Sequence, residues 1–258
     1  MKKELWRTVK LFLLWCLLLC VPIIGVIVWG RILRNYEIMY WTIALGFMLI
    51  DIVFFGKRYV KLSFGRIEKR MIWPVVCMSV LIAAANVYVL HSVHKLIDIE
   101  HLFPKDSNEL HEVYQLFSGI AFFLWGCFFG PIAEEICFRG ILLGGLLKMR
   151  CRPWIAILIT ALAFSLAHVY GMQLVGTLSF GIIVGWLYWR TGSIIPCLII
   201  HIVNNSIAFI PFLHFSVQSN TVLLVILVVG LLLLAYGLWW FGKKCNFVGE
   251  FDPNIPEV

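Results

Sequence analysis

Two adjacent glutamates and an arginine stand within a long apolar run near the middle of the chain. They are Glu134, Glu135 and Arg139. Because each charge is costly to bury in hydrocarbon, ionisable groups at that depth are rare in membrane helices and by default mark a functional site. The three residues therefore indicate an enzyme rather than a lipid-facing surface.

The spacing of these residues along a helix predicts that the two glutamates face different surroundings. Residues four apart share one face of a helix, so Glu135 and Arg139 are expected to pair, while Glu134 points about 100° away from Glu135 and stays free. A buried ion pair that braces a bend near Pro131 is the structural alternative for Glu135 and Arg139. Cys137 is expected to be a structural thiol, because a buried thiol in apolar surroundings is inert unless a cation activates it; a nucleophile is the alternative.

Two further pairs of residues at the same spacing bring more chemistry to the second half of the chain. They are Phe164 with His168, and His201 with Asn205. At about 1.5 Å per residue, Glu134, His168 and His201 each lie roughly 16 to 24 Å from the nearest basic residues of the cytoplasmic side. Polar groups that converge at one depth of a helical bundle require a hydrated cavity.

Such a set of residues has the equipment for amide hydrolysis. Glu134 is the candidate general base for a water molecule, and His168 would orient or share the proton. The side chains of His201 and Asn205 would donate hydrogen bonds to the oxygen that gains charge when water attacks a carbonyl. The alternative for either histidine alone is a hydrogen bond between neighbouring helices.

The composition is that of a membrane protein, with 62% hydrophobic residues, 14% charged residues and a mean hydropathy of +0.94. Eight apolar stretches are long enough to cross roughly 30 Å of hydrocarbon, so we expect an all-α, polytopic membrane protein of about eight transmembrane helices. The fourth stretch is too long for one perpendicular span. Gly130 with Pro131 predicts a single bent helix, in which neighbouring helices satisfy the backbone groups that the break leaves free. The stretches lie near residues 10–30, 38–56, 72–90, 113–147, 154–170, 172–189, 193–212 and 221–241.

The distribution of charge predicts the orientation in the membrane. With the amino terminus inside, sixteen Lys and Arg residues fall in inner segments and four in outer ones, so both termini are expected to be cytoplasmic. The net charge of +7 is explained by attraction to anionic lipid headgroups, and no nucleic-acid partner is implied. The longest exterior segment, around residues 91–112, is acidic and is interpreted as a solvated loop.

We interpret residues 1–258 as a single integral membrane domain. Residues 1–112 would form three variable helices and the outer loop, residues 113–212 the catalytic core, and residues 213–258 the last helix and a cytoplasmic tail. The eight cysteines are scattered, with no CxxC pair and no metal-ligand spacing.

At the polar residues the chain resembles the CPBP family of intramembrane proteases, which includes the CAAX prenyl endopeptidase. The resemblance covers residues 125–210 and consists of an EExxxR element, an FxxxH element and an HxxxN element in that order. They are carried by Glu134, Glu135 and Arg139, by Phe164 and His168, and by His201 and Asn205.

The resemblance implies a cavity open to the cytoplasm and water activated by Glu134 and His168. It also implies oxyanion stabilisation by His201 and Asn205, with Glu135 and Arg139 in support. A metal-free mechanism is favoured. Zinc stays an alternative, because Glu134, His168 and His201 would supply three ligands and leave one open position.

The resemblance further implies a membrane-associated peptide or protein as substrate, either a prenylated carboxy-terminal motif or a bacterial leader peptide. The short chain favours the bacterial branch, a bacterial plasma membrane, and cleavage near the cytoplasmic face. The first alternative is a non-proteolytic scaffold or bacteriocin-immunity protein. A transporter with a proton relay is the second alternative, although no inverted repeat supports it. The oligomeric state is not predicted.

Overall fold

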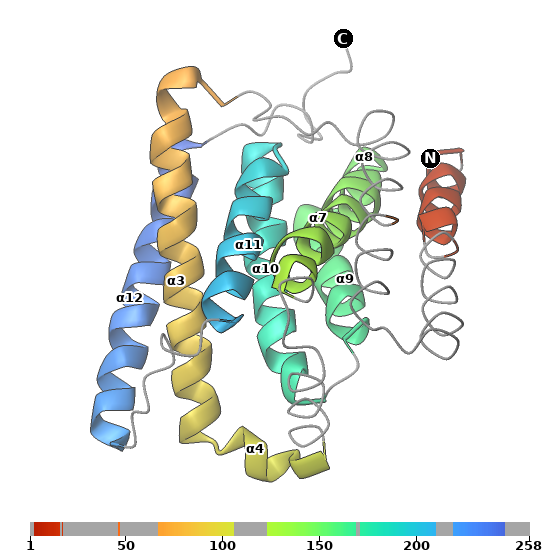
Figure 1. Cartoon of the computed structure of the whole chain (residues 1–258). Coiled ribbons are helices and arrows are strands. Elements are labelled where there is room, and N and C mark those ends of the chain that lie inside the picture. Colours follow the sequence, from red (N-terminus) through yellow and green to blue (C-terminus); the bar gives the residue numbers. More distant parts are fainter. Residues whose placement is uncertain are drawn as a thin grey trace.

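A computed structural model describes residues 3–15, 17, 46, 67–105, 123–168, 171–209 and 219–245. Within these residues every regular element is helical and no strand occurs (Figure 1). The all-α prediction is therefore confirmed for this part of the chain. The first two predicted spans lie mostly outside the described residues, apart from helical residues 3–15, 17 and 46.

The described elements agree closely with the later predicted spans. After the amino-terminal helix of residues 3–15, they are η2 (Lys69–Met71), α3 (Ile72–Leu96), α4 (Ile99–Leu102), η3 (Trp125–Phe129), α7 (Gly130–Glu135), η4 (Ile136–Leu143), α8 (Gly144–Lys148), α9 (Pro153–Leu166), η5 (Gly171–Gln173), α10 (Leu174–Thr191), α11 (Ile195–Phe209) and α12 (Asn220–Lys244).

Two of these segments are long and apolar enough to cross a membrane. Lys69–Leu96 has a mean hydropathy of 2.0 and Asn220–Lys244 a mean hydropathy of 2.8, while the apolar helices Pro153–Leu166 and Ile195–Ala208 are shorter. Only 17% of the apolar window of α12 is buried inside the protein. Since an apolar helix exposed over most of its surface is poorly solvated by water, this favours a lipid environment.

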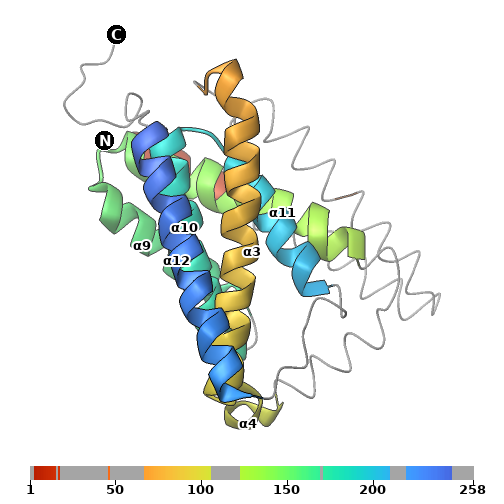
Figure 2. The same cartoon turned by 90° about the vertical axis from the view of Figure 1, so that its left-hand side faces the viewer.

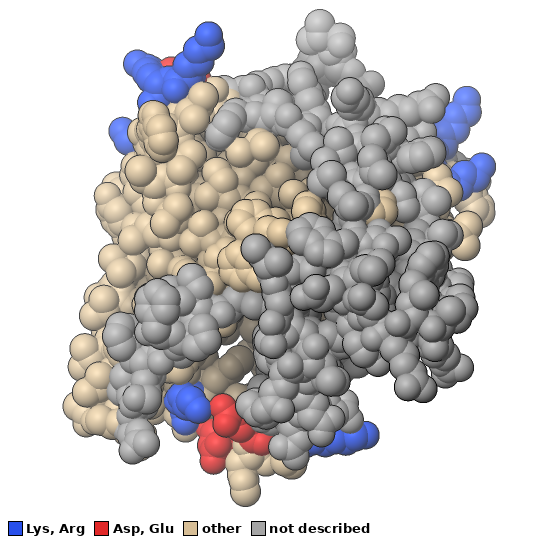
Figure 3. Space-filling model, viewed as in Figure 1, with Lys and Arg blue, Asp and Glu red and all other residues tan. Residues whose placement is uncertain are grey.

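The charged side chains mark the two ends of the helical bundle. Helix α3 begins, and α8, α10 and α12 end, at the upper end of Figure 1. Lys or Arg residues lie there in η2, which precedes α3, and in the last turns of α8, α10 and α12. The lower end holds α4, whose Glu100 pairs with Lys95 at 3.0 Å. Uncharged side chains fill the described surface between these ends on the face in Figure 3. Which end faces the cytoplasm stays a prediction.

Small residues allow the helices to pack closely in two places. Helices α3 and α12 lie side by side (Figures 1 and 2), with Gly230 against Val89 and Gly237 against Ile82. Helix α10 packs on α9, where a Cβ on Gly181 would lie 3.0 Å from Ala161 Cα. Such close backbone approaches drive helix association where lipid removes the hydrophobic driving force.

Residues 125–148 form one continuous helix, as predicted for the fourth span. Its first part, η3, and its later part, η4, are π-helices, and the α-helical segment α7 lies between them. Pro131 stands near the start of α7, and the backbone on both sides of Gly130 stays right-handed helical. Insertions of π-helix often occur at functional sites. Here they flank the segment that carries both glutamates.

The structure corrects the boundary predicted for the outer loop. Helix α3 continues to Leu96, so His91 and His94 lie in its last turns and not in a loop. No Gly or Pro interrupts this part of the helix, and it ends only before Asp98, which adopts a left-handed conformation with φ of 51°. Asp tolerates that conformation better than most residues because its short side chain can bond locally.

Candidate active site

Glu135 is fully buried and holds the centre of a polar cluster. Its Oε1 accepts hydrogen bonds from Arg139 Nη1 at 2.9 Å and from His201 Nδ1 at 2.7 Å. The predicted pair of Glu135 and Arg139 is therefore confirmed. A buried carboxylate requires such partners, because its desolvation is otherwise uncompensated.

Arg139 connects this cluster to the neighbouring helices. Its side chain is 2% exposed, Nη2 donates to Gly181 O at 3.5 Å, and the guanidinium carbon lies 4.7 Å from the centre of the Phe164 ring. An aromatic face stabilises a cation electrostatically when water is excluded. Arg139 thus links α9, α10 and Glu135 through one planar group.

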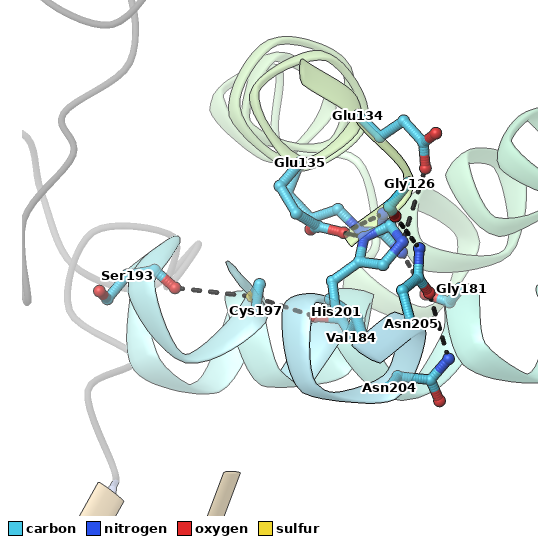
Figure 4. Close-up of polar contacts among 11 residues, drawn as sticks. Gly126, Glu134, Glu135, Gly181, Val184, Ser193, Cys197, His201, Asn204 and Asn205 are labelled. Atoms are coloured by element: carbon cyan, nitrogen blue, oxygen red, sulfur yellow. Dashed lines mark hydrogen bonds and ion pairs between the residues drawn. The ribbon is translucent and has the colours of Figure 1, made fainter. Parts of the chain in front are cut away.

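His201 lies between the two glutamates (Figure 4). Because its Nδ1 donates to the Glu135 carboxylate, Nε2 of the neutral ring carries the lone pair. Nε2 lies 3.6 Å from Glu134 Oε2. The Glu134 side chain is 32% exposed, in contrast to the fully buried Glu135. Glu134 is therefore the carboxylate of the pair that water and a substrate can reach.

Phe164 brings the two histidines together. Its ring centre lies 4.8 Å from that of His168 and 5.9 Å from that of His201, both in edge-on arrangements. The Phe180 ring also contacts His201, with centroids 4.8 Å apart, and lies beside the Phe164 ring, with centroids 6.2 Å apart. Edge-on aromatic contacts restrict ring orientation as well as adding burial. The predicted supporting position of Phe164 thus corresponds to contacts with both imidazoles and with Arg139.

His168 is half-buried at the end of α9, and its tautomer is set by the backbone. Its Nδ1 lies 2.9 Å from Phe164 O, which only accepts hydrogen bonds, so Nδ1 carries the proton and Nε2 the lone pair. Within the described part of the chain no hydrogen bond or ion pair joins His168 to Glu134. The structure therefore brings Glu134 to His201 directly and reaches His168 through Phe164.

Asn205 satisfies a carbonyl group that Pro131 leaves free. In the π-helical turn Gly126 O would accept from the residue five positions later, which is Pro131 and has no N–H. Asn205 Nδ2 donates to Gly126 O at 2.9 Å instead. The expectation that a neighbouring helix supplies hydrogen bonds at the Gly130 and Pro131 break is confirmed.

Two asparagines beside the site escaped the sequence analysis. Asn204 Nδ2 donates to Asn205 Oδ1 at 3.4 Å, and Asn86 Nδ2 donates to Asn204 Oδ1 at 2.8 Å. The available signal was a carboxamide within the apolar run of α3, where polar groups tend to hydrogen bond between helices. Cys137, by contrast, is fully buried in the packed core, in agreement with a structural thiol.

The zinc alternative does not fit the geometry. Among the described residues no three His, Cys, Asp or Glu side chains converge as a metal-ligand group. In particular, Glu134, His168 and His201 do not form one. Their nearest mutual contacts are the 3.6 Å approach of Glu134 to His201 and the shared packing on Phe164.

The fold and the site together define an integral membrane protein that holds an acid–base cluster inside its helical bundle. Residues 116–207 match the sequence model of the family described as Type II CAAX prenyl endopeptidase Rce1-like. The resemblance of this part of the chain to the CPBP and CAAX protease family is therefore confirmed. No match was found among curated proteins or among solved structures.

The matched region contains every residue predicted for the site, from Glu134 to Asn205. At the coarse level the family supports a peptide hydrolase of the membrane-embedded CAAX protease type. Helix α3, which supplies Asn86, and helix α12 lie outside the matched region.

Proposed function

We propose that the protein is an intramembrane endopeptidase that hydrolyses a peptide bond in a membrane-associated peptide or protein with water activated by Glu134. The observation that carries this proposal is the difference in burial between two adjacent carboxylates. Glu135 is fully buried with two short hydrogen bonds, while Glu134 is 32% exposed and faces His201 Nε2. A general base must be both accessible and held near its partners.

The first chemical step transfers a proton from water to Glu134. As the water oxygen bonds to the carbonyl carbon of the substrate, a Glu134 carboxylate oxygen takes the water proton, and the carbonyl oxygen gains the negative charge. His168 Nε2 carries a lone pair and is suited to accept the second hydrogen of that water. This would place His168 in the orienting role that the family resemblance implies.

The second step breaks the carbon–nitrogen bond. The proton held by Glu134 passes to the leaving amine, which restores the carboxylate and completes hydrolysis. Asn205 has two N–H groups and uses one for Gly126 O, so the other is available to the oxyanion. His201 would donate from Nε2 only as the imidazolium, with its Nδ1 still held by Glu135 Oε1.

We propose two classes of substrate, supported by the matched family and by the position of the site among apolar helices. The family description names a CAAX prenyl endopeptidase, so the first class to test is a peptide with a lipid-modified cysteine near its carboxyl terminus. A membrane-associated leader peptide, cut near the cytoplasmic face, is the second. A role in bacteriocin processing or immunity, and residence in a bacterial plasma membrane, stay predictions.

The test uses the full-length protein in detergent with two quenched fluorescent peptides. One carries a prenylated cysteine followed by three carboxy-terminal residues, and the other is an unmodified amphipathic leader-type peptide. We expect Glu134→Gln to lower the rate of hydrolysis by roughly 100- to 10 000-fold, because the amide keeps the size of the side chain but cannot take the proton. Mass spectrometry of the products identifies the bond that is cleaved.

Glu100→Gln is the matched control, since it makes the same chemical change at an exposed residue on α4. It should leave the rate unchanged within about twofold. Hydrolysis at the wild-type rate by Glu134→Gln, or no hydrolysis of either peptide by the wild-type protein, would contradict the proposal. A scaffold or immunity protein would keep its phenotype in the Glu134→Gln variant.

The metal-free form of the mechanism has a separate test. Elemental analysis of the purified, active protein should find far less than one equivalent of zinc, and treatment with a chelator should leave the rate unchanged. Activity that is lost on chelation and restored by zinc would overturn this part of the proposal.

A further inference from the structure

Three carboxamides connect α3 to the helix of residues 125–148 through α11. Asn86 Nδ2 donates to Asn204 Oδ1 at 2.8 Å, Asn204 Nδ2 donates to Asn205 Oδ1 at 3.4 Å, and Asn205 Nδ2 donates to Gly126 O at 2.9 Å. We call these three hydrogen bonds the carboxamide relay. In each of them the donor lies on the side of α3 and the acceptor on the side of Gly126. Bonds aligned in this way polarise one another where the local dielectric constant is low.

The first of these three residues, Asn86, is buried. Asn86 is 2% exposed, and it lies in the middle of the apolar helix α3. A carboxamide is costly to bury without hydrogen bonds, so Asn86 must be offset by a specific contact. A hydrophobic residue of similar volume would fill the same space without that requirement.

The direction of the relay determines which way the Asn205 carboxamide faces. Because Asn204 presents an N–H group to Asn205, the Asn205 oxygen is turned toward Asn204, and its nitrogen is turned toward Gly126 and the side of the helix that bears Glu134 (Figure 4). If the Asn204 carboxamide were reversed, its oxygen would attract the Asn205 N–H group instead. The donor group would then leave the side on which the oxyanion forms.

We propose that Asn86 is a positioning residue for hydrolysis, which acts through Asn204 to hold the Asn205 N–H group toward the oxyanion. This inference rests on the proposed function. It adds a residue of α3, outside the region that matches the family model, to the machinery of the site. Asn86 touches neither Glu134 nor His201 in any described contact, so its effect on the reaction passes through the two other carboxamides.

A double-mutant cycle tests this proposal with the same fluorescent peptide as above. Asn86→Leu keeps the volume but removes the donor, and we expect it to lower kcat by about tenfold or more with KM unchanged within about twofold. Asn205→Ala should lower kcat by roughly 100- to 1000-fold, as expected for loss of an oxyanion donor. In the Asn205→Ala background, Asn86→Leu should have no further effect on kcat.

Ile82→Ala provides a control for loss of α3 packing alone. Ile82 is fully buried on α3, one helical turn from Asn86, and packs over Gly237 of α12 without a hydrogen bond to the three asparagines. This variant should lower the melting temperature while kcat changes by less than about twofold at a temperature where the protein is folded. A tenfold loss of kcat in Ile82→Ala as well would make the effect of Asn86→Leu one of packing and would overturn the proposal.

Asn86→Asp gives a second test that preserves size. When the introduced carboxyl group is protonated it donates to Asn204 Oδ1 and keeps the direction of the relay, and when it is ionised it only accepts and reverses that direction. We therefore expect the ratio of the variant kcat to the wild-type kcat to fall as the pH rises. A simple tether between α3 and α11 survives in both forms, so a ratio independent of pH would contradict the proposal.

The outcomes separate failure of this inference from failure of the proposed function. If Glu134→Gln abolishes hydrolysis while Asn86→Leu leaves kcat at the wild-type value, the proposed function is supported and the positioning role of Asn86 is contradicted. Equal effects of Asn86→Leu in the wild-type and Asn205→Ala backgrounds would also overturn the relay. Full hydrolysis by Glu134→Gln would instead remove the proposed function on which the relay depends.

Discussion

The two sides of the α7 segment place neighbouring carboxylates in different surroundings. On the side that carries Glu135, the carboxylate is fully buried and its Oε1 makes two hydrogen bonds shorter than 3 Å. On the side that carries Glu134, the carboxylate is 32% exposed and its nearest cationic or imidazole partner is His201, at 3.6 Å. Only one peptide bond separates these residues.

The comparison teaches how a helix separates structural support from chemistry. Successive residues point about 100° apart, so one side chain can enter the packed core while its neighbour faces a polar opening. His201 joins the two environments, since its Nδ1 is held by Glu135 and its Nε2 faces Glu134. The buried Glu135 therefore holds the His201 imidazole in the orientation in which its Nε2 faces Glu134.

Arg139→Met should remove the buried ion pair with Glu135 and have the largest effect on stability of the variants proposed here. Removal of the guanidinium leaves the Glu135 carboxylate in the core with only His201 as a partner, and loss of one member of a buried ion pair costs about 3–5 kcal/mol. Thermal unfolding in detergent should show a clearly lower melting temperature. Lys148→Met, at the exposed end of α8, is the matched control and should unfold like the wild type.

Gly181→Ala should weaken the packing of α9 on α10 around Arg139, with a smaller effect on stability than Arg139→Met. The new Cβ would lie 3.0 Å from the Ala161 backbone, so α9 and α10 must separate, at a cost of about 1–3 kcal/mol. The Gly181 carbonyl, which accepts from Arg139, would move with them. Hydrolysis and melting temperature should therefore fall together.

Gly237→Ala is the control for the substitution at Gly181. Its Cβ would lie 2.6 Å from Ile82 Cγ1, a side-chain atom of α3 that makes no described contact with Glu135 or Arg139. We expect Gly237→Ala to change the melting temperature but not kcat. If both glycine variants lost kcat equally, α9 and α10 would have no special role in holding the site.

Phe164→Leu should sharpen the comparison by disturbing the imidazoles without removing a charge. Leucine preserves much of the buried volume but loses the ring contacts with His168 and His201 and the face beneath Arg139. Aromatic and cation–π contacts of this kind contribute about 1 kcal/mol each, so we expect a loss of about tenfold in kcat. Equal activity of Phe164→Leu and the wild type would show that Phe164 only fills space.

Much of the fold was predictable because hydropathy and helix length are local properties. The later six spans correspond to described helices, and Gly130 with Pro131 correctly predicted one long helix whose free carbonyl is satisfied by a neighbour. The end of α3 was placed too early, since histidines in an apolar helix resemble the start of a loop. Eight spans, the orientation and the opening to the cytoplasm stay predictions.

The site was predictable where spacing along one helix decides a contact, as for Glu135 and Arg139. Contacts between helices were harder, because sequence spacing does not show which nitrogen of His201 meets which glutamate. The expected sharing of one water molecule by Glu134 and His168 stays a prediction; the contacts that the structure shows are Glu134 with His201 Nε2 and His168 Nδ1 with the Phe164 carbonyl. Asn86 was missed because it lies more than a hundred residues from its partner.

The central claim is that the adjacent glutamates have different roles, and one paired measurement tests it most directly. Glu134→Gln and Glu135→Gln make the same chemical change, and kcat and melting temperature can be measured for both in one detergent. We expect Glu134→Gln to lose hydrolysis and melt like the wild type. Glu135→Gln should melt about 5 °C lower or more, since Arg139 loses its carboxylate partner, and should retain more activity than Glu134→Gln. The opposite pattern, an active Glu134→Gln variant beside a stable but inactive Glu135→Gln variant, would contradict the account.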